Sequence, residues 1–150
     1  MPYFESMDEL REFFGKDTFA TVCLGAQVDS FEEEPYRSQV SMTLDPARHC
    51  NAQGFVMGGV FMALCDFALA VCSNTNQVAC CSTNHAVEMM SRAKGERLIA
   101  KAECTKCGRS LSFYEVNLYD ELGTHVARMT ATTMRTPQVD AAAGKGCCGA

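Results

Sequence analysis

The chain has 150 residues, the usual length of a single domain with room for a substantial core. Hydrophobic residues make up 47% of it and charged residues 21%, which is ordinary for a soluble globular protein. A formal net charge of -5 provides no general basic field, so nucleic acid is not expected as a partner. The start of the chain shows no signal peptide, and the longest apolar run is shorter than a membrane span. We therefore expect a cytoplasmic protein with no membrane partner.

Ten cysteines are many for such a protein. Without an export signal they are expected to be reduced thiols rather than a disulfide framework. Cys104 and Cys107 have the spacing of a metal or redox CxxC motif. However, positions i and i+3 of a regular strand point to opposite faces, and no second CxxC completes a zinc site. We therefore predict no metal and no cofactor.

The N-terminal part predicts a helix followed by two strands. Ser6 and Glu9 have the spacing of a capping box, and they place a short helix within a helical segment of residues 1–17. Alternation of apolar and polar residues predicts a strand over residues 20–28 and a second strand over residues 39–44.

The centre of the chain predicts one long buried helix over about residues 58–74. This segment is apolar on all sides, which is typical of a helix in the core rather than on the surface. Asp66 is the only Asp, Glu, Lys or Arg between Arg48 and Glu88. A carboxylate in such a helix is costly unless partners or a function keep it there. Asp66 is therefore the first candidate for a functional residue.

The C-terminal part predicts four more strands, in which the alternation slips once, at Phe113-Tyr114, as a bulge would produce. The strand patterns cover residues 80–90, 97–104, 111–119 and 127–133. One apolar helix beside a run of antiparallel strands predicts an α+β fold, with a sheet wrapped around the helix. Residues 18–136 would form this domain, and residues 137–150 an Ala/Gly-rich tail that is expected to be disordered.

A motif lies directly before the helix. The chain reads Asn51-Ala52-Gln53-Gly54-Phe55-Val56-Met57-Gly58-Gly59, and Asp66 follows nine positions after Met57. This arrangement resembles the hotdog-fold acyl-CoA thioesterases of the phenylacetic-acid-degradation type. Their pattern is Asn-x-x-Gly-x-x-His-Gly-Gly followed by an Asp in the helix. Segments at residues 90–94 and 106–110 also resemble the family, and the likeness covers roughly residues 18–135.

The resemblance implies a hotdog fold and hydrolysis of a small acyl- or aryl-CoA thioester. Asp66 would be the general base or nucleophile, Asn51 would orient the water or the carbonyl, and the Gly58 amide would polarise that carbonyl. Apolar surroundings should raise the pKa of Asp66. The family's His is Met57 here, a thioether that cannot carry a proton. The alternative is a non-catalytic hotdog protein that binds acyl-CoA or another small ligand.

A third possibility is a hotdog hydratase or dehydratase, which would pair a carboxylate with a nearby His. It is less favoured because no His lies close to Asp66 in the sequence. His49, His85 and His125 are each expected to be structural or exposed.

The spacing along the helix has a consequence for assembly. Gly58 and Asp66 are eight residues apart, which is about 12 Å along a helix axis. One thioester carbon cannot contact both, because reacting groups lie within about 3 to 3.5 Å. We therefore expect a homo-oligomer, a dimer or dimer of dimers, with Asn51 and Gly58 of one subunit and Asp66 of another at the interface.

The remaining candidates would bind the substrate. Ser82 and Thr83 fall near the family position whose hydroxyl helps hold the water. Arg92, Lys94 and Lys106 could meet the phosphates of coenzyme A, although an ordinary solvated charge is the other interpretation of each. Met57 and Gly59 complete this set through their place in the motif.

Overall fold

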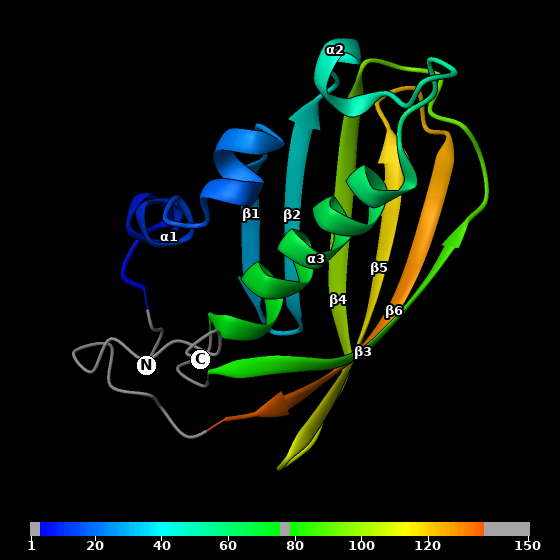
Figure 1. Cartoon of the computed structure of the whole chain (residues 1–150). Coiled ribbons are helices and arrows are strands. Elements are labelled where there is room, and N and C mark those ends of the chain that lie inside the picture. Colours follow the sequence, from blue (N-terminus) through cyan, green and yellow to red (C-terminus); the bar gives the residue numbers. More distant parts are fainter. Residues whose placement is uncertain (1–3, 76–78, 137–150) are drawn as a thin grey trace, which may run out of the picture.

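A six-stranded antiparallel sheet curves around one long helix in the computed structural model (Figure 1), which describes residues 4–75 and 79–136. The helices are α1 (Met7–Phe14), the π-helix η1 (Phe19–Cys23), α2 (Pro46–His49) and α3 (Gly58–Asn74). The strands are β1 (Gln27–Glu33), β2 (Tyr36–Thr43), β3 (Cys80–Met89), β4 (Arg97–Cys107), β5 (Leu111–Asp120) and β6 (His125–Arg135). Their order in the sheet is β1-β2-β4-β5-β6-β3. The predicted α+β hotdog arrangement is confirmed.

Helix α3 forms the centre of the core and contacts all six strands. Leu64, Ala68 and Val71 are completely buried between helix and sheet. The Ser38 hydroxyl of β2 donates a hydrogen bond of 2.7 Å to the Ala68 carbonyl, which shows that this side of β2 faces the helix. The apolar character of residues 58–74 is therefore the cause of their burial, as the sequence predicts.

The predicted strand over residues 20–28 is wrong in its first half. Residues 19–23 form a π-helical turn instead. The Asp17 carboxylate lies just before this turn and accepts a hydrogen bond from the Ala20 amide at 3.2 Å. Ala20 and Leu24 are buried and four residues apart, a helical spacing, whereas Val22 between them is exposed. The apparent alternation thus combined a helical turn with the start of β1.

The bulge predicted at Phe113-Tyr114 of β5 is wrong. Burial along β5 alternates without interruption from Leu111 to Asp120. The sequence pattern slips because two apolar residues, Leu111 and Phe113, lie on the exposed face of the strand. The neighbouring strand β4 does carry a bulge at this level: Cys104 pairs with Tyr114 and Lys106 with Phe113, so Thr105 is an extra residue.

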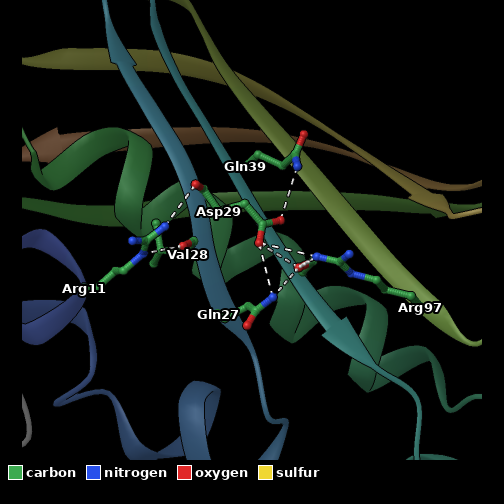
Figure 2. Close-up of polar contacts among 7 residues, drawn as sticks. Arg11, Gln27, Val28, Asp29, Gln39 and Arg97 are labelled. Atoms are coloured by element: carbon green, nitrogen blue, oxygen red, sulfur yellow. Dashed lines mark hydrogen bonds and ion pairs between the residues drawn. The ribbon is translucent and has the colours of Figure 1, made fainter. Parts of the chain in front are cut away.

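A second bulge joins α1, β1, β2 and β4 through the residue Asp29 (Figure 2). The Asp29 carboxylate accepts hydrogen bonds from Ser41 at 2.9 Å and Gln39 at 3.2 Å, and it lies 3.5 Å from the Arg97 guanidinium. Arg11 of α1 donates to the Val28 carbonyl at 3.0 Å and the Asp29 carbonyl at 3.4 Å. These bonds hold α1 beside the edge strand β1, where Phe14 of α1 contacts Phe67 of α3.

The described residues contain no helix that is both long and apolar enough to cross a membrane. None of the eight cysteines among them forms a disulfide. The predicted disordered tail, residues 137–150, lies outside the described residues.

Candidate active site

The loop before α3 is shaped by the side chain of Asn51. Its Oδ1 atom accepts hydrogen bonds from the backbone amides of Gln53 at 2.9 Å and Phe55 at 3.1 Å. The loop ends at Met57, directly before the helix. The Met57 amide donates a hydrogen bond to the His49 carbonyl at 2.9 Å. No described residue accepts a hydrogen bond from the Asn51 Nδ2 group. Asn51 can therefore build the loop with one end of its amide and offer a donor with the other.

Helix α3 begins at Gly58, which is partly buried, and Gly59, which is exposed. The first amides of a helix have no partner within the helix and favour negative charge. A Cβ atom on Gly58 would lie 2.6 Å from Cε of Met89, whereas one on Gly59 would meet nothing closer than 4.0 Å. Glycine at position 58 thus lets the side chain of Met89, on β3, cover the start of the helix.

Asp66 lies on a stripe of α3 that the sheet does not cover. Gly59 and Met62 share this stripe, at intervals of three and four residues, and all three residues are exposed. The Asp66 side chain is 53% exposed, so the expectation that it sits in the core is wrong for a single chain. The reason is that β3 is the last strand of the sheet, and the sheet does not close around the helix.

His85 is the residue that the sequence analysis missed. It pairs with Ala131 on β6, a buried position, so its side chain faces the helix. Its Nε2 atom lies 3.4 Å from Oδ1 of Asp66, and its side chain is only 13% exposed. The two residues are far apart in the sequence, and only the placement of β3 beside α3 brings them together. Although no His lies close to Asp66 in the sequence, His85 lies beside it in the fold.

The charge state of Asp66 responds to its burial and to two neighbouring residues. Partial burial raises the pKa of Asp66, His85 lowers this pKa, and the carboxylate of Asp17 raises it. The net result is a raised pKa, as expected from the sequence. A carboxylate of this kind accepts a proton more readily near neutral pH than an ordinary aspartate does.

A cleft of about 720 Å³ opens beside the start of α3, between the loop before the helix and the segment that joins β3 to β4. Its lining includes Phe55, Val56, Phe61, Met89, Met90 and Arg92. The Arg92 guanidinium lies over the Phe55 ring, 3.7 Å from its centroid. The size and the mostly apolar lining with one cation suit a small organic ligand. Since Met89 also covers Gly58, the cleft and the helix start form one continuous site.

The cleft wall between β3 and β4 is held by a buried carboxylate, Asp120. Its Oδ2 accepts the amides of Lys94 at 2.8 Å and Gly95 at 3.1 Å, and its Oδ1 accepts those of Leu122 at 3.1 Å and Thr124 at 2.8 Å. Burial acts to raise the pKa of Asp120, but hydrogen bonds from the Lys94, Thr124 and Gly95 amides and from the Thr124 side chain outweigh it and lower the pKa to about 2.

The other predicted binding residues are spread along the chain. Ser82 pairs with Thr133 and so faces the helix, whereas Thr83 is a bulge residue whose hydroxyl donates to the Thr132 carbonyl at 3.2 Å. Arg92, Lys94 and Lys106 are exposed. Lys106 lies nine residues beyond the start of β4, about 30 Å from the cleft wall that carries Arg92. Within one chain, Arg92 and Lys106 cannot contact the same phosphate.

A single chain does not bring the three predicted catalytic groups together. Helix α3 runs without a break from Gly58 to Asn74, so Gly58 and Asp66 stay about 12 Å apart along its axis. Asn51 lies with Gly58 at the helix start, and Asp66 lies with His85 farther along. Among the residues that the structure describes, no group of three or more His, Cys, Asp or Glu side chains is suited to hold a metal ion.

The sheet, the central helix and the motif at its start are those of a hotdog-fold thioesterase. The thioesterase superfamily matches residues 53–127, half of the sequence, and the chain belongs to this family. A Deinococcus radiodurans protein named as a suspected esterase is 31% identical over 87 residues. That match covers 58% of this chain and 59% of the relative, so the chain matches about six-tenths of the relative's length.

Two solved structures show the same fold. The PaaI protein of the phenylacetic acid degradation operon of E. coli superposes with a TM-score of 0.76 at 18% identity, over 89% of this chain and 99% of that one. A Streptococcus pneumoniae hypothetical thioesterase, solved with coenzyme A, gives 0.72 at 19% identity, over 89% and 98% of the two chains. These likenesses confirm the hotdog fold that the resemblance implies.

Proposed function

We propose that this protein hydrolyses a small acyl- or aryl-CoA thioester. The observation that carries the proposal is the Asp66 carboxylate, which stands on the uncovered stripe of α3 with a raised pKa and His85 beside it. The family membership supports thioester chemistry. The coenzyme A bound to the similar streptococcal protein supports coenzyme A as the thiol part of the proposed substrate.

In the proposed mechanism Asp66 takes a proton from a water molecule as the water oxygen attacks the thioester carbon. The carbonyl oxygen becomes negative and receives hydrogen bonds from the Gly58 amide and the Asn51 Nδ2 group. The carbon–sulfur bond then breaks, the thiolate leaves, and the proton held by Asp66 passes to its sulfur. Met57 takes no part in proton transfer, because a thioether cannot carry a proton.

The distance along α3 supports a site shared between copies of the chain, if Gly58 and Asp66 act on the same thioester. Asn51 and Gly58 of one subunit would face Asp66 of another across the uncovered stripe, in a dimer or a dimer of dimers. A two-fold interface repeats every contact, so such a dimer would hold two equal sites. In this arrangement the acyl group enters the cleft beside Met89, and Ser82 lies near the attacking water.

Coenzyme A would extend from this site to the molecular surface. Its phosphates would meet Arg92 and Lys94 on one subunit, with Lys106 available only from another because of its distance from the cleft. Met57, Gly59 and Thr83 would contact the substrate near the reacting centre. These binding roles are part of the proposal.

The direct test is a panel of acyl- and aryl-CoA esters assayed for release of free thiol. At least one ester should be hydrolysed well above the background rate. No thiol release from any member of the panel, by a protein that is folded and binds coenzyme A, would refute the proposed activity.

Mixing two inactive variants tests the shared site. Asn51→Asp keeps the Oδ1 acceptor that holds the loop but removes the Nδ2 donor, and Asp66→Asn removes the base. Each variant alone should be nearly inactive. After unfolding and refolding together, half of the dimers are mixed and one of their two sites is intact, so about a quarter of the wild-type activity should return. If the mixture stays as inactive as its components, both groups act within one chain and the interface model is wrong.

His85 gives a prediction about pH. Because His85 lowers the pKa of Asp66, replacing it with Gln should raise that pKa further. Hydrolysis needs the ionised carboxylate, so the acid limb of the pH–rate profile should move to higher pH in His85→Gln. A profile of kcat against pH measures the shift. His125→Gln is the control, since His125 pairs with Tyr119 and stacks on it at 4.6 Å. A profile that moves to lower pH, or does not move, would contradict the pairing.

Two other functions keep a specific observation in their favour. Met57 in place of the family's His favours a non-catalytic protein that binds acyl-CoA, which would bind coenzyme A with or without Asp66 and release no thiol. The Asp66–His85 contact favours a hydratase or dehydratase, which would consume an enoyl-CoA without releasing thiol. Chromatographic analysis of the products from an enoyl-CoA and from its saturated analogue distinguishes all three.

A further inference from the structure

The bulge at Thr105 changes the meaning of the Cys104–Cys107 pair. On a regular strand these residues would point to opposite faces. Here Cys104 pairs with Tyr114 and Cys107 with Ser112, and both of those β5 residues are buried, so both cysteines face the same side. The hydroxyl of Thr105 donates to the Phe113 carbonyl at 3.0 Å and stabilises this arrangement. The prediction that the two cysteines point apart is wrong.

The register also sets the distance between the two cysteines. Their partners on β5 are two residues apart, so the Cα atoms of Cys104 and Cys107 are separated by roughly 6.6 Å. Disulfides span Cα distances of about 4.4 to 6.8 Å. The Cα separation therefore lies at the upper end of the normal range, and the side chains of Cys104 and Cys107 already share a hydrogen bond.

The sulfur of Cys107 is exposed and surrounded by donors. The Arg135 guanidinium donates to it at 3.2 Å, and the Ser112 hydroxyl donates to it at 3.7 Å. Hydrogen bonds from a cation and a hydroxyl to one sulfur stabilise the negative charge that the sulfur carries when it acts as a nucleophile. Cys107 thus combines the access and the surroundings of a reactive thiol.

Cys104 has different surroundings. It is only partly exposed, and burial raises the pKa of its thiol, as does the neighbouring Cys107. A reagent in solution therefore reacts with Cys107 first, while the neighbouring Cys104 stays protonated. This division into an accessible thiol and a covered neighbour is the one that a two-step thiol exchange uses.

Two further cysteines lie in the same region. The Cys72 thiol is buried and donates to the Tyr36 carbonyl at 3.3 Å, and burial raises its pKa to about 12. Cys80 on β3 pairs with Arg135 on β6, and the charge of Cys107 acts to raise the pKa of Cys80. Cys72 is therefore unreactive, and Cys80 is the competing partner that an experiment must distinguish.

We propose that Cys104 and Cys107 form a dithiol site that reacts with low-molecular-weight disulfides such as oxidised glutathione. The Cys107 thiolate attacks one sulfur of the disulfide, forms a mixed disulfide and releases one thiolate. Cys104 loses its proton and attacks the Cys107 sulfur, which forms the Cys104–Cys107 bond and releases the second thiolate. The protein loses two electrons and two protons in total, and the small disulfide gains them. This site is independent of the proposed hydrolysis.

The experiment treats the reduced full-length protein with oxidised glutathione and follows it by intact mass and peptide mapping. The wild type should lose two hydrogen masses and yield a cross-linked peptide containing both cysteines. Cys104→Ser should stop at one glutathione on Cys107. Cys107→Ser should react at least about tenfold more slowly at this site. Cys81→Ser removes an exposed thiol on a different strand, β3, and should leave the cross-link unchanged.

Arg135 provides a second variant that leaves both sulfurs in place. Arg135→Gln should slow the first step by roughly tenfold, and Arg135→Lys should restore most of the rate, because a positive charge beside the Cys107 sulfur stabilises it as the attacking nucleophile. The proposal is overturned if glutathione is retained on Cys107 in the wild type, if Cys107 links to Cys80 instead, or if Cys107→Ser reacts at the wild-type rate.

Discussion

Replacing Asp66 by Asn is expected to lower kcat for thioester hydrolysis by about 10² to 10⁴-fold, the usual contribution of a general base. The amide keeps the size of the side chain and its place on the uncovered stripe of α3, but it cannot accept a proton from water. Because the carboxylate is 53% exposed in the single chain, the change should not unfold the protein. Steady-state kinetics with the best ester of the panel measures the loss.

A matched control for this variant lies on β3. Glu88→Gln removes a carboxylate of the same strand as His85, but Glu88 pairs with Arg128 on the outer face of the sheet and does not face the helix. It should retain nearly full activity. The pH profile adds a second readout: wild-type activity should fall as pH decreases through the raised pKa of Asp66, whereas the residual activity of Asp66→Asn should lose this dependence. Equal kcat values for wild type and Asp66→Asn would remove Asp66 from the mechanism.

Asp120→Ala is expected to destabilise the fold by about 3 kcal/mol, since charge-assisted hydrogen bonds are lost and buried backbone donors are left unpaired. Asp120 is 2% exposed and accepts four backbone amides, from Lys94, Gly95, Leu122 and Thr124. For a domain of this size the melting temperature should fall by roughly 6 to 12 °C. Differential scanning calorimetry or a urea titration measures the change.

The same residue predicts the stability of the protein in acid. The pKa of Asp120 is about 2 in the folded chain, below the value of about 3.9 for an unfolded aspartate. Its contribution is therefore present above pH 4 and is lost as pH falls toward 2. In Asp120→Ala this part of the acid dependence should disappear. Asp8→Asn is the control, because the Asp8 side chain is 94% exposed. A control that destabilises the protein as much as Asp120→Ala would contradict the assignment.

The parts of the fold that the sequence predicts well are those set by burial alone. The helix at Gly58–Asn74 and the four C-terminal strands follow from apolar periodicity, and the structure confirms them. The strand predicted over residues 20–28 is wrong in its first half because the spacing of Ala20, Leu24 and Ala26 only resembles strand alternation. Hydrogen bonds to Asp17 and Phe19 form a helical turn there instead. Local hydrogen bonding there outweighs the pattern, and periodicity does not report it.

The candidate site was predictable where it is local and unpredictable where it is not. Asn51 and Gly58 lie close together because a short loop joins them, and the sequence motif includes this whole loop. The exposure of Asp66 depends on where the sheet ends, and the contact with His85 depends on which strand comes last. The inserted Thr105 likewise depends on how β4 pairs with β5. These three features arise from strand order and register, which a sequence pattern specifies only weakly.

The two outermost strands of the sheet differ in how they are protected. An edge strand with unpaired backbone groups is a template on which another chain can add. On β1, the bulge at Asp29 interrupts the regular ladder, and Arg11 occupies two of the strand's carbonyls. On β3, no described segment pairs with the outer side. Among the described residues, the β3 edge is therefore more open to pairing with an added strand than the β1 edge.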